Sequence, residues 1–170
     1  MISRALTFGS AAAAYEEFRP GYPDELVDAV LAYAGRPIRT ALEIGAGTGK
    51  ATRAFAARGI AVTATEPDQA MLVELRKHLP ATVVTVQAAF EDLPLRAVYD
   101  LAFAAASLHW TTPDQRCLRL AAMLTHRGVV ASFGGPMHLA DPSVENAVQA
   151  ARSEFLDSDD VPSPDGNPGR

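Results

Sequence analysis

Three alternating glycines close a short apolar run in the stretch ALEIGAGTGK, residues 41–50. Gly45, Gly47 and Gly49 allow the backbone to approach a ligand closely, and a strand followed by such a loop and a helix is the mononucleotide-binding arrangement. Glu66 stands about 20 positions further along, where an acidic residue accepts hydrogen bonds from ribose hydroxyls. The spacing therefore predicts a site for a ligand that contains a ribose. The alternatives are a plain tight turn and a solvated carboxylate.

Two residues beside the loop indicate which ligand it suits. The dinucleotide fingerprint G-x-G-x-x-G would have its third glycine at position 50, which is Lys50 in this sequence. Glu43 lies in the apolar run before the loop, and we expect its carboxylate at the mouth of the loop, where it would repel a pyrophosphate. S-adenosylmethionine carries an ammonium and a sulfonium and has no phosphate. Glu43 therefore favours S-adenosylmethionine over a dinucleotide.

The segments around the loop alternate between strand-like and helix-like patterns. We predict strands at residues 40–44, 60–65, 82–86, 99–104 and 129–133, and helices at residues 23–34, 48–58, 67–78, 113–124 and 142–156. Such alternation produces parallel strands joined by right-handed crossovers. The expected fold class is α/β: a three-layer, Rossmann-like parallel sheet of about five strands in the order 3-2-1-4-5, with helices on both faces. The loops after the first four strands then meet at the edge of the sheet where ligands bind.

With these elements placed, the sequence resembles the class I S-adenosylmethionine-dependent methyltransferases, in the small-molecule branch similar to the ubiquinone-biosynthesis and trans-aconitate types. The resemblance covers roughly residues 15–135, and its motifs are YEEFRPGYP at 15–23, ALEIGAGTGK at 41–50, TEPDQAML at 65–72, QAAFEDLPL at 87–95 and YDLAFAAASLHW at 99–110. It implies an enzyme that transfers a methyl group from S-adenosylmethionine to a small-molecule acceptor.

The resemblance also implies the residues that hold the cofactor. These come from the N-terminal lid motif, the glycine loop and the ends of the next three strands: Tyr15, Arg19, Glu43, Gly45, Ala46, Gly47, Gly49, Glu66, Pro67, Ala89, Phe90, Glu91 and Ala105. Arg19 could hold the cofactor carboxylate through a bidentate pair, and the alternative for the lid motif is an exposed turn.

Candidates for catalysis and for substrate binding follow the fourth and fifth strands. A base is needed only when the methyl acceptor must lose a proton as it attacks, and His109 is the candidate for that role. Its alternative is a packing histidine beside Trp110, which could itself line a substrate wall or pack the loop. His138, just after the fifth strand, is a second candidate for substrate contact.

Composition excludes several other classes of function. The formal net charge of −5 argues against a broad nucleic-acid surface. The single cysteine, Cys117, allows no internal disulfide, and no Cys/His spacing predicts a metal site. No apolar run reaches the roughly 18 residues of a membrane span, and no secretory signal is evident. We therefore expect a cytoplasmic protein.

The two ends of the sequence differ from the centre. We expect one domain over residues 1–156 with a lid at 1–36, little order in residues 1–14 without a ligand, and a disordered acidic tail at 157–170. The family sheet usually has seven strands, whereas nothing strand-like follows residue 133. The fifth strand would then leave an open edge that is prone to pairing.

Two interpretations of this short sheet stay open. The chain could be a truncated product of a longer enzyme, or it could complete itself as a homo-oligomer through the open edge or through the helix at 142–156. Competing functions are a weakly active or inactive cofactor-binding or interaction domain and, less favoured because of Lys50 and Glu43, a nicotinamide-dependent oxidoreductase.

Overall fold

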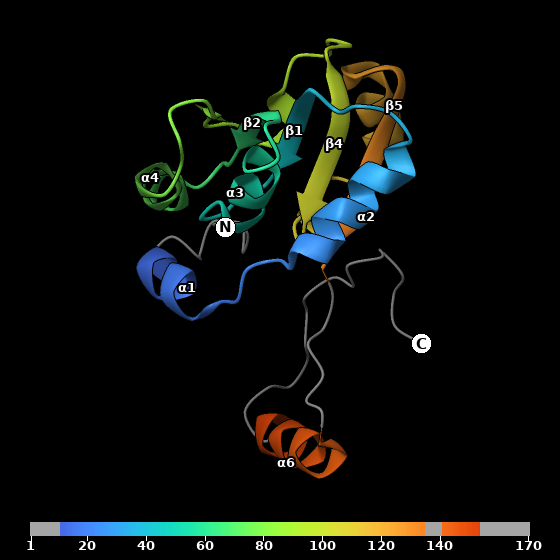
Figure 1. Cartoon of the computed structure of the whole chain (residues 1–170). Coiled ribbons are helices and arrows are strands. Elements are labelled where there is room, and N and C mark those ends of the chain that lie inside the picture. The colour runs from blue at the N-terminus through green and yellow to red at the C-terminus, as the bar shows by residue number, and fades with distance from the viewer. Residues whose placement is uncertain (1–10, 135–140, 154–170) are drawn as a thin grey trace.

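The protein is built around one parallel sheet with the strand order β3-β2-β1-β4-β5 (Figure 1). The computed structural model describes residues 11–134 and 141–153. The strands are β1 (Thr40–Ile44), β2 (Ala61–Thr65), β3 (Val84–Val86), β4 (Tyr99–Ala105) and β5 (Leu124–Phe133). The α-helices are α1 (Ala12–Phe18), α2 (Asp24–Ala34), α3 (Lys50–Ala56), α4 (Gln69–Lys77), α5 (Arg116–Met123) and α6 (Pro142–Ser153). The predicted fold class and strand order are confirmed.

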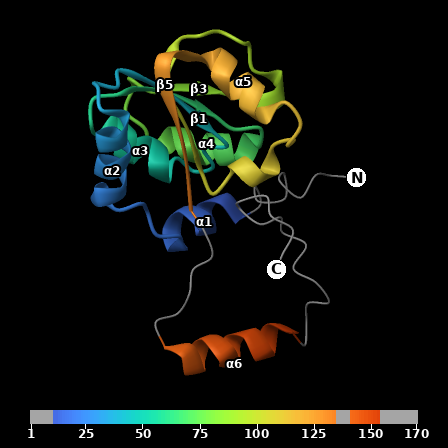
Figure 2. The ribbon, with the colours of Figure 1, turned by 90° about the vertical axis from the view of Figure 1, so that its right-hand side faces the viewer.

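The two faces of the sheet are covered by different helices. Successive residues of a strand point to opposite faces, so Ala41 packs among side chains of α2 and α3, whereas Leu42 and Ile44 pack against α5 and the 3₁₀ turn η3 (Phe90–Asp92). Helix α4 covers β2 through Leu72 and Leu75. Figure 2 shows α2 and α3 on the opposite side of the sheet from α5. This burial on both faces explains why the strands are apolar along their whole length.

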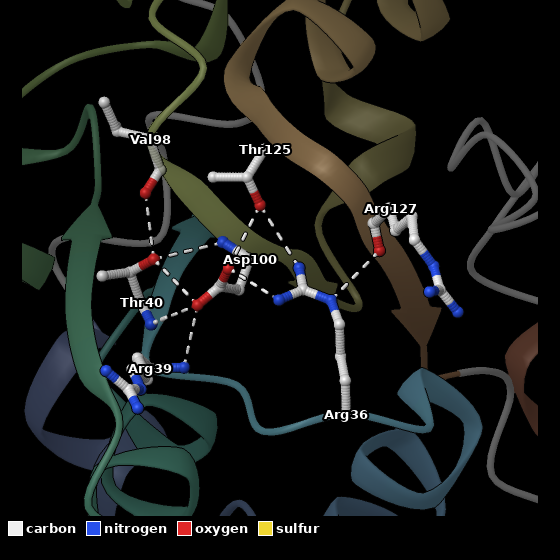
Figure 3. A network of polar contacts seen from close by, with 7 residues as sticks. All are labelled: Arg36, Arg39, Thr40, Val98, Asp100, Thr125 and Arg127. Carbon is white, nitrogen blue, oxygen red and sulfur yellow. Dashed lines mark hydrogen bonds and ion pairs between the residues drawn. The ribbon is translucent and has the colours of Figure 1, made fainter.

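A carboxylate network fixes the amino-terminal edge of the sheet (Figure 3). Oδ2 of Asp100 accepts hydrogen bonds from the amides of Arg39 (2.9 Å) and Thr40 (3.3 Å), and Oδ1 accepts from Arg36 Nη1 (3.0 Å) and Thr125 Oγ1 (3.1 Å). Hydrogen bonding from the Arg39 amide, followed by that from Arg36 and the two threonines, lowers the pKa of Asp100 to about 2 against the opposing effect of burial. The network joins the starts of β1, β4 and β5, opposite the edge that carries the predicted site.

The fifth strand begins earlier than the sequence indicates. We predict it at residues 129–133, but β5 is Leu124–Phe133, with an irregular register where it starts beside β4. The polar residues in its first half look like a loop in the sequence. Thr125 is bonded to Asp100, and the carbonyl of Arg127 accepts from Arg36 Nε (3.4 Å), so long-range contacts hold this segment in the sheet.

The predicted ends of other elements are also corrected. The helix predicted at 48–58 is shorter because Gly49 has φ +86, which a helix does not allow, and α4 begins after Asp68, whose carboxylate accepts from the amides of Ala70 and Met71. The helix predicted at 113–124 begins only at Arg116. At the N-terminus, α1 begins at Ala12, so the expectation of little order fails for residues 12–14.

Helix α6 stands apart from the sheet and its covering helices in both views (Figures 1 and 2). Within residues 11–134 and 141–153, no strand pairs with the outer edge of β5. No helix in these described ranges is long and apolar enough to cross a bilayer. The predicted tail at 157–170 lies outside the described residues, and assembly through the β5 edge stays a prediction.

Candidate functional site

The glycine loop after β1 is tight and closely packed on one side. Gly45, Gly47 and Gly49 have φ of +65°, +57° and +86°, which side chains rarely adopt. A Cβ on Gly45 would lie 2.8 Å from Cβ of Ser107, whereas a Cβ on Gly47 would meet no heavy atom within 4 Å. Ala46, between them, is buried, and its amide donates to the carbonyl of Thr65 (2.9 Å). The loop therefore presents bare backbone to open space at Gly47.

Glu66, at the end of β2, holds this loop in place. Its Oε2 accepts from the amide of Gly47 (2.8 Å) and its Oε1 from the amide of Asp68 (2.9 Å). The side chain is buried, with the residue 6% exposed, and this burial raises the pKa of Glu66 against the effect of the two amides. Each carboxylate oxygen has a second lone pair, so Glu66 can still accept from ligand hydroxyls. Pro67 follows it, half-buried, at the same edge.

Glu43 does not lie at the mouth of the loop, and that prediction is wrong. Strand alternation turns its side chain toward α3, where it is 1% exposed and accepts a short hydrogen bond from the hydroxyl of Thr52. Burial, reinforced by the charge of Glu66 and opposed by Thr52 and Arg53, raises the pKa of Glu43 to about 8. In this conformation, Glu43 does not contact a ligand directly, because its oxygens are covered.

The turn after β3 carries the predicted neighbours of the adenine. Phe90 is buried against the sheet, whereas Ala89 is half-buried and Glu91 is exposed. Arg119 of α5 fixes this turn: its Nη2 donates to the carbonyls of Phe90 (3.1 Å) and Leu93 (2.8 Å), and its guanidinium lies 5.5 Å from the centre of the Phe90 ring. Arg119 could not be predicted from the sequence, because nothing in the pattern of its helix points to a contact with the turn.

The segment after β4 holds the candidate base. Ala105 is the last residue of β4, and His109 and Trp110 lie half-buried in the 3₁₀ turn η4 (Leu108–Trp110), with ring centroids 4.7 Å apart. Burial, and then the charge of Arg116, lowers the pKa of His109. A neutral imidazole at physiological pH can accept a proton, so His109 is in the protonation state that a base requires. His138 lies outside the described residues.

Helix α1 brings the lid motif to the site. Tyr15 lies on this helix and Arg19 is its C-cap residue, with the Arg19 guanidinium 5.5 Å from the centre of the Tyr15 ring. Between them, the carboxylate of Glu16 pairs with Arg53 of α3 (2.7 Å) and lies 3.5 Å from Nζ of Lys50. Glu16 was not among the predicted site residues, and its position next to Tyr15 in the lid motif is the one signal for it in the sequence.

The first two site loops are joined by Glu66. Its carboxylate bonds Gly47 in the loop after β1, and its amide donates to the carbonyl of Val86 at the end of β3 (3.1 Å). A single residue at the end of β2 therefore connects three neighbouring strand ends.

The remaining loops are joined by side-chain bonds to the segment after β4. Oε1 of Glu91 accepts from the amide of Thr112 (2.7 Å), and the hydroxyl of Ser107 donates to the carbonyl of Ile44 at the end of β1. Hydrogen bonds thus link all four predicted site loops into one ring. Among the described residues, no group of three or more His, Cys, Asp or Glu side chains could hold a metal ion.

Comparison with known proteins identifies the family. The methyltransferase domain family matches residues 42–133. An uncharacterized methyltransferase of Mycobacterium tuberculosis is 40% identical over 125 residues, which are 73% of this chain and 50% of that protein. A trans-aconitate 2-methyltransferase of Delftia acidovorans is 35% identical over 98 residues, 55% of this chain and 37% of that protein. The chain thus spans half or less of the length of these curated relatives.

A solved structure agrees with the sequence relatives. A candidate type II methyltransferase of Anaeromyxobacter dehalogenans superposes with a TM-score of 0.63 at 28% identity, covering 86% of this chain and 62% of that one. The family predicted from the motifs is confirmed, and with it the predicted cofactor of the class. The chain belongs to the methyltransferase domain family of the S-adenosylmethionine-dependent class.

Proposed function

We propose that this chain binds S-adenosylmethionine at the ring of loops on the carboxyl edge of the sheet and serves methyl transfer to a small-molecule acceptor. The observation that carries this proposal is Glu66, a buried carboxylate that fixes the amide of Gly47 and keeps lone pairs for two ribose hydroxyls. The open space at Gly47 supports it, because a ligand can approach the backbone there. Glu66 also lies about 20 positions after the glycine loop, where folds of this kind carry an acidic residue that binds the ribose.

The other site residues have roles that follow from their chemistry. S-adenosylmethionine, when bound, supplies a methyl group that its sulfonium has already activated. Ala89, held beside the buried Phe90, provides an apolar side for a flat base, and Arg19 supplies a guanidinium for a carboxylate. His109, in its neutral form, takes a proton from an acceptor that must lose one. Trp110, beside it, provides a wall for the acceptor. Positioning then contributes much of the rate.

The charge around the loop disfavours a dinucleotide. The carboxylate of Glu66 lies beneath the loop, and a pyrophosphate there would add negative charge beside it. A cationic ligand has the opposite effect, because it lowers the free energy of the ionised carboxylate. The preference for a cation therefore rests on Glu66, because the raised pKa of Glu43 keeps that side chain protonated near neutral pH.

Calorimetric titration with S-adenosylhomocysteine and with NAD tests the proposal. We expect binding of S-adenosylhomocysteine, and we expect Glu66→Ala to weaken it by roughly 1–3 kcal/mol because ribose hydroxyls and the Gly47 amide lose an acceptor. Glu25→Gln, an exposed change on α2, is the matched control and should leave binding unchanged. Tighter binding of NAD would overturn the cofactor assignment, and equal affinity of Glu66→Ala would overturn the ribose assignment.

Methyl transfer is tested separately with cofactor labelled on the methyl group. Incubation with an extract of small metabolites should yield a labelled product from the unmodified chain. Binding without any labelled product would favour the cofactor-binding domain without transfer activity over the methyltransferase. His109→Ala should lower the labelling rate without weakening S-adenosylhomocysteine binding if His109 acts as the base.

A further inference from the structure

Helix α1 is attached through Glu16 to the start of α3, directly after the glycine loop. Oε1 of Glu16 lies 2.7 Å from Nη2 of Arg53, and Oε2 lies 3.5 Å from Nζ of Lys50. The same Nζ donates a hydrogen bond to the main-chain carbonyl of Glu16 (2.7 Å), so Lys50 contacts both the backbone and the side chain of Glu16. The side chains of Glu16 and Lys50 are 16% and 12% exposed, so this contact is largely shielded from water.

The surroundings of Glu16 form a niche for an anion. Arg53 also donates to the carbonyl of Thr48 (3.1 Å), which fixes its guanidinium beside the loop. The hydroxyl of Thr48 is buried beside this carboxylate. Burial would raise the pKa of Glu16, but the nearby Thr48 hydroxyl and the charges of Arg53 and Lys50 outweigh it and lower the pKa. Glu16 is therefore held as a carboxylate.

This niche occupies the part of the fold where a nucleotide phosphate would be placed. In strand–loop–helix folds, phosphates lie against the glycine loop and the start of the following helix. Here the two cations beside the loop, Lys50 and Arg53, already face a carboxylate of the same chain. A phosphate would have to displace Glu16, and with it α1, before it could reach them.

We propose that Glu16 is a positioning and specificity-determining residue: it holds α1 closed over the loop and fills the place that a ligand phosphate would need. The effect of Glu16 on ligand binding rests on the proposed cofactor function, whereas the attachment of α1 through Glu16 does not. Tyr15 precedes Glu16 on α1 and Arg19 follows at the C-cap of that helix, so the ion pair of Glu16 sets the position of both lid residues. A phosphate-free cofactor leaves the pair intact.

Hydrogen exchange of the ligand-free chain tests the attachment. Glu16→Gln removes the charge and keeps the shape, and we expect amide exchange in residues 12–18 to become at least about tenfold faster. Glu17→Gln alters the neighbouring exposed carboxylate and should leave exchange unchanged. The double variant Glu16→Lys with Arg53→Glu restores an ion pair with the two charges exchanged, and should recover part of the protection of these amides from exchange. Unchanged exchange in Glu16→Gln would overturn the proposal, as would equal effects of the two glutamine variants.

Ligand binding tests the specificity. Glu16→Gln should weaken the binding of S-adenosylhomocysteine by roughly tenfold, because the closed state of α1 is less populated. Inorganic pyrophosphate should raise the melting temperature of Glu16→Gln, but not that of the unmodified chain or of Glu17→Gln. Pyrophosphate stabilising all three chains equally would overturn the proposal. If the unmodified chain failed to bind S-adenosylhomocysteine, the proposed function would fail, while the exchange and pyrophosphate results would still decide the role of Glu16.

Discussion

Replacing Glu43 with glutamine tests the electrostatics beneath the glycine loop. Glu43 is almost fully buried, and its side-chain hydrogen bond is to the hydroxyl of Thr52. Its pKa rises from 4.5 to about 8, mainly through burial. Glutamine has nearly the same volume, keeps an oxygen that can accept from Thr52, and cannot ionise. The substitution therefore removes the titration and little else.

The size of the effect follows from the two pKa values. In the unfolded chain Glu43 titrates near 4.5, and in the folded chain near 8. Between these values the folded protein holds a proton that the unfolded chain has lost, so stability falls as the pH rises, by up to about 1.4 kcal/mol per pH unit. Over the whole window the loss is about 5 kcal/mol, a large part of the 5–15 kcal/mol typical of a domain. Glu43→Gln has no such loss.

Urea unfolding at about pH 5.5, 7 and 8.5 measures this difference. We expect Glu43→Gln to gain stability relative to the unmodified chain as the pH rises, by about 2 kcal/mol between the first two conditions. Glu17→Gln, which changes an exposed carboxylate, should follow the unmodified chain. Parallel curves for Glu43→Gln and the unmodified chain would refute the reasoning, because Glu43 would then be ionised in the folded state.

Two other substitutions test the framework of the site. Gly45→Ala places a Cβ 2.8 Å from Ser107 at φ +65, and we expect urea titration to show a loss of about 1–3 kcal/mol, whereas Gly21→Ala, which meets no atom within 4 Å, should change little. Equal losses would contradict the strained position. Asp100→Asn should lower stability by about 1–3 kcal/mol at neutral pH, and the difference should shrink as the pH falls from 3.8 toward 2, where the unmodified carboxylate loses its own charge. A pH-independent loss would show that the shape of Asp100 matters and its charge does not.

The sequence was sufficient to predict the features that depend on local pattern. The β4 run and the glycine loop identify the central strands, and Gly35, with φ +61 after α2, ends that helix as expected. The strand order followed because alternating elements allow few connections. The position of Glu66 at the end of β2 followed from its spacing alone.

The features that could not be predicted depend on contacts between distant segments. The early start of β5 depends on Asp100, 25 residues before Thr125, which accepts its hydroxyl, and on Arg36, which bonds Thr125 and Arg127. The direction of the Glu43 side chain depends on which face of β1 meets α3, which spacing does not specify. Glu16 lies 37 residues before Arg53, and no local pattern joins them. A sequence identifies groups that can do chemistry more readily than the partners that hold them.

The ring of hydrogen bonds among the site loops also determines when the loops become ordered. Glu66 joins the ends of β1, β2 and β3, and Glu91 and Ser107 close the ring through the segment after β4. Each loop therefore loses its backbone freedom when the sheet folds and not when a ligand arrives. Preorganisation of this kind reduces the entropy lost on association, so a ligand at this edge meets loops that are already in place.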